Sequence, residues 1–154
     1  MRYIILVAPF IFICHFLEEL PGFVSWFNQH VSRGINSGLF WGVNVSALVI
    51  TILVVLVEFF MASVFSSAVI ILWFSFLMLA NAIFHITGAF VDKRYMPGLI
   101  TAIILYLPYY ILIVRSIIKN HRLKGSLIVF AAFLGALPML IHGYMILFLG
   151  DRLF

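Results

Sequence analysis

Residues 39–61 read LFWGVNVSALVITILVVLVEFFM, and this stretch decides the fold. It carries one ionisable side chain, Glu58. A helix needs about 20 apolar residues to cross the hydrocarbon layer of a membrane, and this run is long enough. Only helices and closed barrels span lipid, and an uninterrupted apolar run of this kind is typical of a helix. We therefore predict a transmembrane helix over residues 39–61.

Four further apolar segments accompany this stretch. They cover about residues 3–20, 64–90, 97–118 and 126–149. The first is short, and it crosses a membrane only if its polar end is buried in protein. Because the later segments are joined by short connections, neighbouring helices are expected to run in opposite directions. The expected fold is an all-α membrane protein, a single integral membrane domain over residues 1–154 that forms an antiparallel bundle of five transmembrane helices.

The segment between the first two spans, residues 22–35, has a mixed character. Phe23, Trp26 and Phe27 recur at helical spacing, with polar residues between them. This pattern predicts a short interfacial amphipathic helix that lies on the membrane surface. A re-entrant loop is the alternative. We expect His30, in the same segment, to be solvated.

The composition supports a membrane protein. Of 154 residues, 66% are hydrophobic and 9% are charged, whereas a soluble domain is about half apolar and a quarter charged. The formal charge of +4 comes from basic residues between apolar runs, where they set topology and contact lipid head groups. The expected partners are therefore membrane lipids and no nucleic acid. The only cysteine is Cys14, so there is no internal disulfide.

The basic residues are spread almost evenly over the two ends of the predicted bundle. One end carries Arg2, Arg115, Lys119, Arg122 and Lys124, and the other carries Arg33, Lys93, Arg94 and Arg152. The excess at the first end is small. Under the positive-inside rule, it predicts a cytoplasmic N-terminus.

Polar residues of four predicted helices fall at a common depth near the other end of the bundle. His15, Asn44, His85 and His142 each lie roughly five to seven residues from that end, which is about 8–10 Å inside the boundary. An ionisable group at a helix centre costs at least about 2.5 kcal/mol on insertion scales, so such groups need partners. We predict a shared, protein-lined cavity. The alternative is that the acidic residues lie among head groups and the histidines make ordinary interhelical hydrogen bonds.

The first helix contributes the motif His15-Phe16-Leu17-Glu18-Glu19. His15 and Glu19 are four residues apart and share a helix face. They can both bind one divalent metal ion, zinc or iron, with His85 and His142 as the candidate ligands from other helices. Glu18 is then available as a general base that polarises metal-bound water.

Two other uses of the motif stay open, and a purely structural hydrogen-bonded cluster is a further alternative. Neighbouring carboxylates in a cavity can share acid–base work without a metal, with His15, Glu18 and Glu19 as the catalytic residues. The same layer can also carry protons or ions. Five further residues are predicted to support the site or bind substrate, and these are Asn44, Asn81, Tyr144, Lys93 and Arg94.

These motifs resemble a known family. His15-x-x-Glu18-Glu19 on a first membrane helix is similar to the defining motif of the bacterial HXXEE-domain membrane proteins. Later blocks that are also similar are Asn81-x-x-x-His85-x-x-Gly88, Tyr95-x-Pro97-Gly98, and Gly135 leading to His142. The resemblance covers nearly the whole chain. It implies a multi-span protein of the bacterial cytoplasmic membrane whose motif is suspected of catalysis, with no established substrate, reaction or cofactor.

The sequence therefore favours a membrane-embedded, metal-dependent enzyme: a hydrolase, transferase or isomerase. Its substrate is expected to be a lipid or another apolar molecule, because a site about 8–10 Å below the surface is reached most readily from the bilayer. With the N-terminus inside, the site lies near the outer face. The alternative is a non-enzymatic binder or transporter of a small ligand, metal ion or proton, or an accessory subunit. A homodimer is compatible with the small residues Gly34, Gly38 and Gly42.

Overall fold

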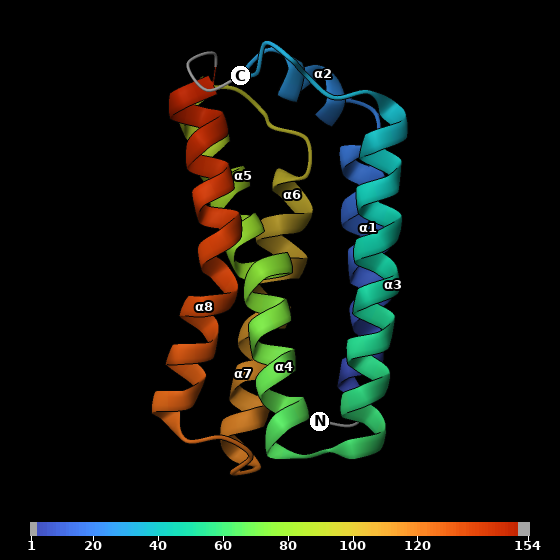
Figure 1. The fold of residues 1–154 in the computed structure, drawn as a ribbon, viewed down its shortest axis with the longest axis vertical. Helices are drawn as coiled ribbons and strands as arrows, with labels where there is room; N and C mark the ends of the chain where they lie inside the picture. Colours follow the sequence, from blue (N-terminus) through green and yellow to red (C-terminus); the bar gives the residue numbers. More distant parts are fainter. Residues whose placement is uncertain (1–2, 151–154) are drawn as a thin grey trace.

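The computed structural model describes residues 3–150, and every regular element in that range is helical. Four continuous helical stretches are long and apolar enough to cross a membrane. They are α3 (Ser37–Met61), α4–η2–α5 (Val64–Phe74, Ser75–Ala80, Asn81–Asp92), α6–η3–α7 (Leu99–Thr101, Ala102–Tyr106, Leu107–Lys119) and α8–η4 (Gly125–Tyr144, Met145–Leu149). Figure 1 shows them side by side along the long axis. Their limits lie within a few residues of the predicted ones.

The first helical stretch is shorter than these four. It consists of a 3-10 turn, η1 (Ile4–Val7), followed by α1 (Ala8–Glu19). Pro9 lies in the first turn of α1, where its missing N–H removes no helical hydrogen bond. The α1 helix packs against α3, and the two lie side by side in Figure 1.

The turn from α3 to α4 lies at the lower end of Figure 1 and contains a buried carboxylate. Ala62 takes a left-handed conformation, with φ of 46°, and ends α3. Ser63 and Ser66 then form a capping box that begins α4. The Glu58 side chain accepts hydrogen bonds from Ser66 Oγ at 2.5 Å and from Ser67 Oγ at 3.3 Å. Two hydroxyl donors therefore satisfy this glutamate inside the bundle.

The predicted interfacial helix over residues 22–35 is wrong in length. The α2 helix covers Phe23–Asn28 alone. The chain turns away because the Asn28 side chain donates to the Ile35 carbonyl and accepts from the Ile35 N–H, and Gly34 takes a positive φ of 57°. Trp26 and the residue after it are buried. The segment thus covers one end of the bundle, at the top of Figure 1.

His30, expected to be solvated, is instead held against the end of α5. Its Nε2 atom lies 3.0 Å from Asp92 Oδ1, and its Nδ1 atom lies 2.9 Å from the Trp26 carbonyl oxygen. The Trp26 indole donates to the other oxygen of Asp92 at 2.7 Å. Sequence spacing gave no sign of this pairing, because Asp92 is 62 residues from His30.

Three of the long helices contain a π-helical segment: η2, η3 and η4. Such segments are rare and occur frequently at functional sites. The η2 segment directly precedes Asn81, and η3 directly follows Thr101.

Two of the basic residues from which the orientation was predicted, Arg2 and Arg152, lie outside the described residues.

Candidate functional site

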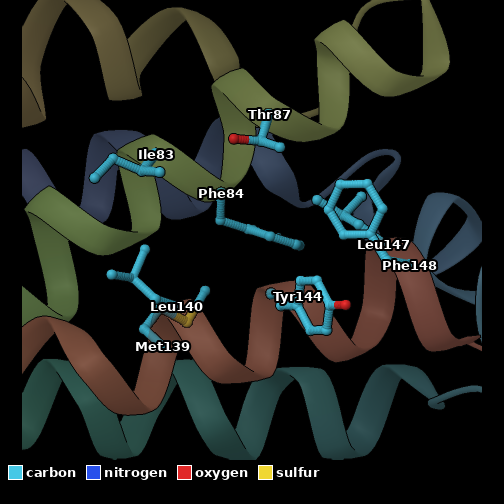
Figure 2. A pocket seen from close by; sticks show the side chains of 9 residues that line it. Ile83, Phe84, Thr87, Met139, Leu140, Tyr144, Leu147 and Phe148 are labelled. Atoms are coloured by element: carbon cyan, nitrogen blue, oxygen red, sulfur yellow. The ribbon is translucent and has the colours of Figure 1, made fainter.

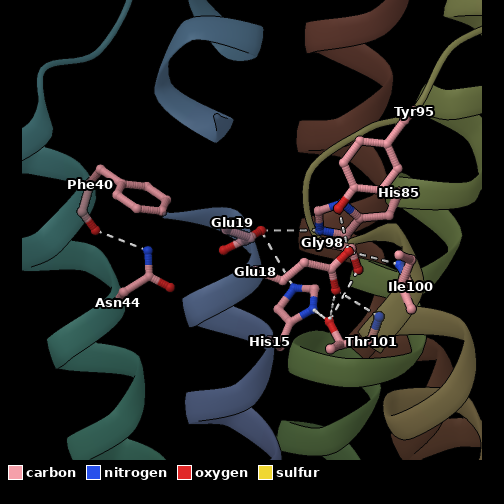
Figure 3. Close-up of polar contacts among 10 residues, drawn as sticks. All are labelled: His15, Glu18, Glu19, Phe40, Asn44, His85, Tyr95, Gly98, Ile100 and Thr101. Carbon is pink, nitrogen blue, oxygen red and sulfur yellow. Dashed lines mark hydrogen bonds and ion pairs between the residues drawn. The ribbon is translucent and has the colours of Figure 1, made fainter. Parts of the chain in front are cut away.

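Two helices bring His15, Glu19 and His85 together in the interior. The α1 helix places His15 one turn before Glu19, and α5 brings His85 to the same carboxylate (Figure 3). Glu19 Oε1 lies 3.4 Å from His15 Nε2 and 3.1 Å from His85 Nε2. The exposed fractions are 1% for His15, 5% for Glu19 and 0% for His85. One ligand atom from each residue lies within 4.8 Å of the others, a spacing that a metal ion can bridge.

Thr101 fixes the tautomer of His15. Thr101 Oγ1 lies 2.5 Å from Glu18 Oε2 and 2.8 Å from His15 Nδ1. A carboxylate only accepts, so the single hydroxyl proton goes to Glu18 and the Thr101 oxygen accepts from His15. The proton of a neutral His15 is therefore on Nδ1, and its Nε2 lone pair faces Glu19. Metal-binding histidines are oriented in this way by a hydrogen bond at the far nitrogen.

The nitrogen atoms that face Glu19 make no hydrogen bond. His15 Nε2 and both ring nitrogens of His85 are buried and have no hydrogen-bond partner in the described part of the chain. The two Nε2 atoms lie within ion-pair distance of Glu19, but neither makes a hydrogen bond to it. Buried polar atoms are nearly always satisfied, so this group lacks a partner that a cation would supply.

Gly98 packs against both imidazoles and explains the Tyr95-x-Pro97-Gly98 turn. Its φ of 94° favours glycine. A Cβ atom at this position would lie 2.5 Å from Cε1 of His85 and 2.9 Å from Cε1 of His15. The backbone can therefore pass this close to the two imidazole rings only at a residue without a side chain. This close approach holds the rings in place.

Glu18 takes a different position from the one predicted. Its two oxygens accept from the Tyr95 hydroxyl at 2.5 Å, the Ile100 N–H at 3.0 Å, and the Thr101 N–H and hydroxyl at 2.7 and 2.5 Å. These four bonds use the accepting capacity of a carboxylate. Glu18 therefore fixes the loop before α6 and, through Thr101, the His15 ring. Its role as general base stays a prediction.

Tyr95 stays protonated as the donor to Glu18. Partial burial and the neighbouring carboxylate raise the pKa of Tyr95 to about 12. Its hydroxyl therefore keeps its proton throughout the physiological range. The loop that carries Tyr95 and Gly98 is tied to α1 by this bond.

A cavity of about 360 Å³ opens beside the His–Glu group. Its walls are mostly aromatic and aliphatic, and its polar members are His15, Glu19, Asn44, Asn81 and His142. Figure 3 shows Asn44 on α3, across from Glu19, where its amide donates to the Phe40 carbonyl at 2.9 Å. The buried Asn81 Oδ1 has no hydrogen-bond partner among residues 3–150. His142 lines this cavity, but it is not part of the three-residue group.

Three predicted supporting residues lie elsewhere. Tyr144 lines a separate groove of about 140 Å³ between α5 and α8, together with Thr87 and apolar residues (Figure 2). Arg94 donates to the Gln29 side chain at 2.6 Å and lies 3.5 Å from Asp92. Lys93 is exposed and ends α5 with a φ of 53°. None of these side chains is among the cavity residues.

Two residues that lie at the site are not in the predicted set of site residues. Thr101 was not singled out, because nothing in its own neighbourhood distinguishes it from other threonines. The Tyr106 ring packs on His15 with a centroid distance of 4.2 Å, and its buried hydroxyl has no hydrogen-bond partner in the described chain. The sequence did hold one signal that could have identified Thr101. It lies three residues after Gly98, a spacing that puts both residues at the first turn of a helix.

The sequence model of one protein family matches this chain. The family is described as "Protein of unknown function with HXXEE motif", and the match covers residues 6–113, more than half of the chain. The chain belongs to this family. The resemblance inferred from the motif is thus confirmed, although the match stops within α7 and does not include His142. No curated protein and no solved structure matches the chain.

Proposed function

We propose that this HXXEE family member is a membrane-embedded, metal-dependent enzyme that acts on a lipid or another apolar substrate. The observation that carries the proposal is the group formed by His15, Glu19 and His85. Two buried imidazoles and a carboxylate converge there, and His15 Nε2 and both ring nitrogens of His85 have no hydrogen-bond partner among the described residues. A divalent cation would give these three side chains a common partner.

The donor set suits zinc or iron. Two histidines and one glutamate are the ligands of one class of catalytic zinc site, which keeps a fourth position open. Two histidines and one carboxylate are also typical of non-haem iron(II). His15 and Glu19 line the cavity, so an open position would face its interior. When bound, such an ion supplies Lewis-acid activation of a substrate oxygen or of water.

The chain's own residues would divide the remaining work. Thr101 and Glu18 hold His15 in the tautomer that presents Nε2. Asn44, Asn81 and His142 lie on other walls of the cavity, where they can contact the polar part of a substrate. His142 is the candidate for proton transfer in place of Glu18, because it lines the cavity and no hydrogen bond holds it among the described residues.

The membrane setting follows from the same proposal. The short stretch η1–α1 joins the four long helices as a fifth crossing, in an antiparallel bundle. Burial of Glu19 and His15 against α5 and α6 supports this, because it removes the polar end of the stretch from lipid. The small excess of basic residues supports an N-terminus in the cytoplasm and a site near the outer face of the bacterial cytoplasmic membrane.

Turnover of membrane lipid tests the proposal. Purified protein would be reconstituted with a total bacterial lipid extract and supplied with zinc or iron(II), and mass spectrometry would follow the lipids over time. We expect one lipid class to be consumed by the wild type and not by Glu19→Ala. Glu58→Ala, which alters the other buried glutamate, is the matched control and should keep turnover. An unchanged lipid profile with the metal-loaded wild type would contradict an enzyme that acts on these lipids.

A further inference from the structure

The wall of the cavity includes exposed residues on α3 and α8. Residues that both line the cavity and face outward mark its opening. Leu39 is 54% exposed and Val43 is 59% exposed, both on α3, and His142 on α8 is also exposed. We call these three residues the lateral portal. Lining residues on α1 and α5, such as His15 and Phe84, are buried.

The packing of the helices explains this opening. The α3 helix packs against η1, α1 and α4, whereas α8 packs against α4, η2 and α5. Figure 1 shows α3 and α8 on opposite sides of the bundle. Both belong to stretches able to span a membrane. Val43 lies six residues into α3, about 9 Å along its axis, so the lateral portal faces hydrocarbon.

Direct access from the aqueous end is closed by α2. Phe23 and Phe27 of α2 form part of the cavity wall. The α2 segment is held down because Trp26 donates to Asp92 at 2.7 Å and His30 lies 3.0 Å from the same carboxylate. A polar substrate arriving from water would have to break these contacts. A lipid already in the bilayer would not.

The walls of the cavity match an acyl chain. Away from α2, the lining is formed by Phe12, Ala47, Phe76 and Leu77. Phe12 lies seven residues before Glu19 on one helical stretch, so the apolar part extends about 10 Å from the carboxylate. A cavity of about 360 Å³ is within the size range of small-ligand sites. Among residues 3–150 no group donates to Asn81 Oδ1, and a hydroxyl or amide N–H of the lipid beside its acyl chain would supply this donor.

We propose that the substrate is a bilayer lipid that inserts one acyl chain through the lateral portal. The chain lies along the apolar wall, and its polar end faces Glu19 and Asn81. Ala47 lines the far part of the cavity and limits the chain length. This inference rests on the proposed function for its chemistry, but capture of the chain does not need a metal.

Photo-crosslinking tests the portal. The full-length protein would be reconstituted in vesicles of phosphatidylcholine that carries a diazirine at the end of one acyl chain. After illumination, labelled peptides would be mapped by mass spectrometry. We expect labels on cavity residues in the wild type, and at least a tenfold drop in Val43→Trp, whose indole fills the lateral portal.

The control is Leu53→Trp, on the same helix. Leu53 is 56% exposed and is not among the cavity residues, so its replacement should leave labelling unchanged. Ala47→Phe should move cavity labelling toward probes with shorter chains. Equal labelling of the cavity in Val43→Trp and wild type, or labels confined to outward-facing residues of the wild type, would overturn the proposal.

The test separates this inference from the proposed function. Glu19→Ala should lose metal and turnover yet still capture the acyl chain, because Phe12 and Ala47 are intact. Val43→Trp should bind metal as the wild type does. If the wild type captures the acyl chain without lipid turnover, the lateral portal is supported and the proposed enzyme is contradicted. If the wild type binds metal without capturing the chain, only the lateral portal is contradicted.

Discussion

Two buried glutamates lie toward opposite ends of the bundle and have different surroundings. Glu58 is 1% exposed and accepts hydrogen bonds from Ser66 and Ser67. Glu19 is 5% exposed and faces nitrogen atoms of two histidines that make no hydrogen bond to it. Both side chains are buried, but their partners differ. A carboxylate that accepts from hydroxyl donors stabilises the fold, whereas one that lies between two imidazoles without a hydrogen bond is suited to binding a ligand.

Removal of either glutamate side chain should have the largest effect, and the two variants test the comparison directly. Glu19→Ala is expected to abolish metal binding and to lower the thermal stability of the metal-free protein less than Glu58→Ala does, because no hydrogen bond to a histidine is lost. Glu58→Ala should keep metal binding and cost about 1–3 kcal/mol, since the buried Ser67 hydroxyl loses its acceptor and Ser66 keeps only the Ser63 carbonyl at 3.2 Å. Isothermal titration with zinc and thermal unfolding in detergent measure the two effects. A similar loss of stability in both variants would contradict the distinction.

Addition of a methyl group at position 98 should have the next largest effect, a loss of metal affinity. Gly98→Ala places a Cβ against both imidazoles and strains a φ of 94°, so the rings must move. We expect at least a tenfold loss of metal affinity, by analogy with other changes that misplace metal ligands. Gly42→Ala is the control, because its Cβ would meet nothing within 4 Å. Equal affinity in the two variants would show that Gly98 does not hold the rings.

Thr101 should have an intermediate effect. Thr101→Val removes the hydroxyl that fixes His15 Nδ1 and keeps the shape of the side chain. Loss of such a partner typically costs about 10–100-fold in metal affinity. Thr101→Ser should restore binding. The control Thr51→Val alters a buried threonine that donates to Ala47 within α3, and it should bind metal as the wild type does.

Tyr95→Phe should have the smallest effect. Glu18 keeps three donors from Ile100 and Thr101, so metal affinity should fall by less than about threefold. Because the pKa of Tyr95 is about 12, its proton stays in place from pH 7 to pH 10. The ratio of wild-type to variant affinity should therefore be constant over that range and shrink only as the pH approaches 12. A ratio that changes near pH 8 would contradict this description of the loop.

The fold was largely predictable because hydropathy and length determine membrane helices. The four long stretches follow from apolar runs alone. The length of α2 did not follow, because it depends on one side chain, Asn28, closing a loop on Ile35. That contact has no periodic signature. Amphipathic spacing over the same residues therefore gave a helix that is too long.

The site was predictable in its composition and less so in its roles. The direction of successive helices was enough to place His15, Glu19 and His85 at one end. The role of Glu18 depended on which way its carboxylate turns, and this is decided by Thr101, a residue 83 positions later. Sequence spacing on α1 shows which residues share a face. It does not show which loop of the chain provides donors to one of them.

Elemental analysis of the purified protein tests the central claim most directly. The wild type, Glu19→Ala and Glu58→Ala would be prepared without a histidine tag, loaded with zinc or iron(II), freed of excess metal and measured by mass spectrometry. We predict about one equivalent of metal per chain in the wild type and in Glu58→Ala, and none in Glu19→Ala. Equal metal in all three proteins, or none in the wild type after loading, would contradict a metal site at Glu19.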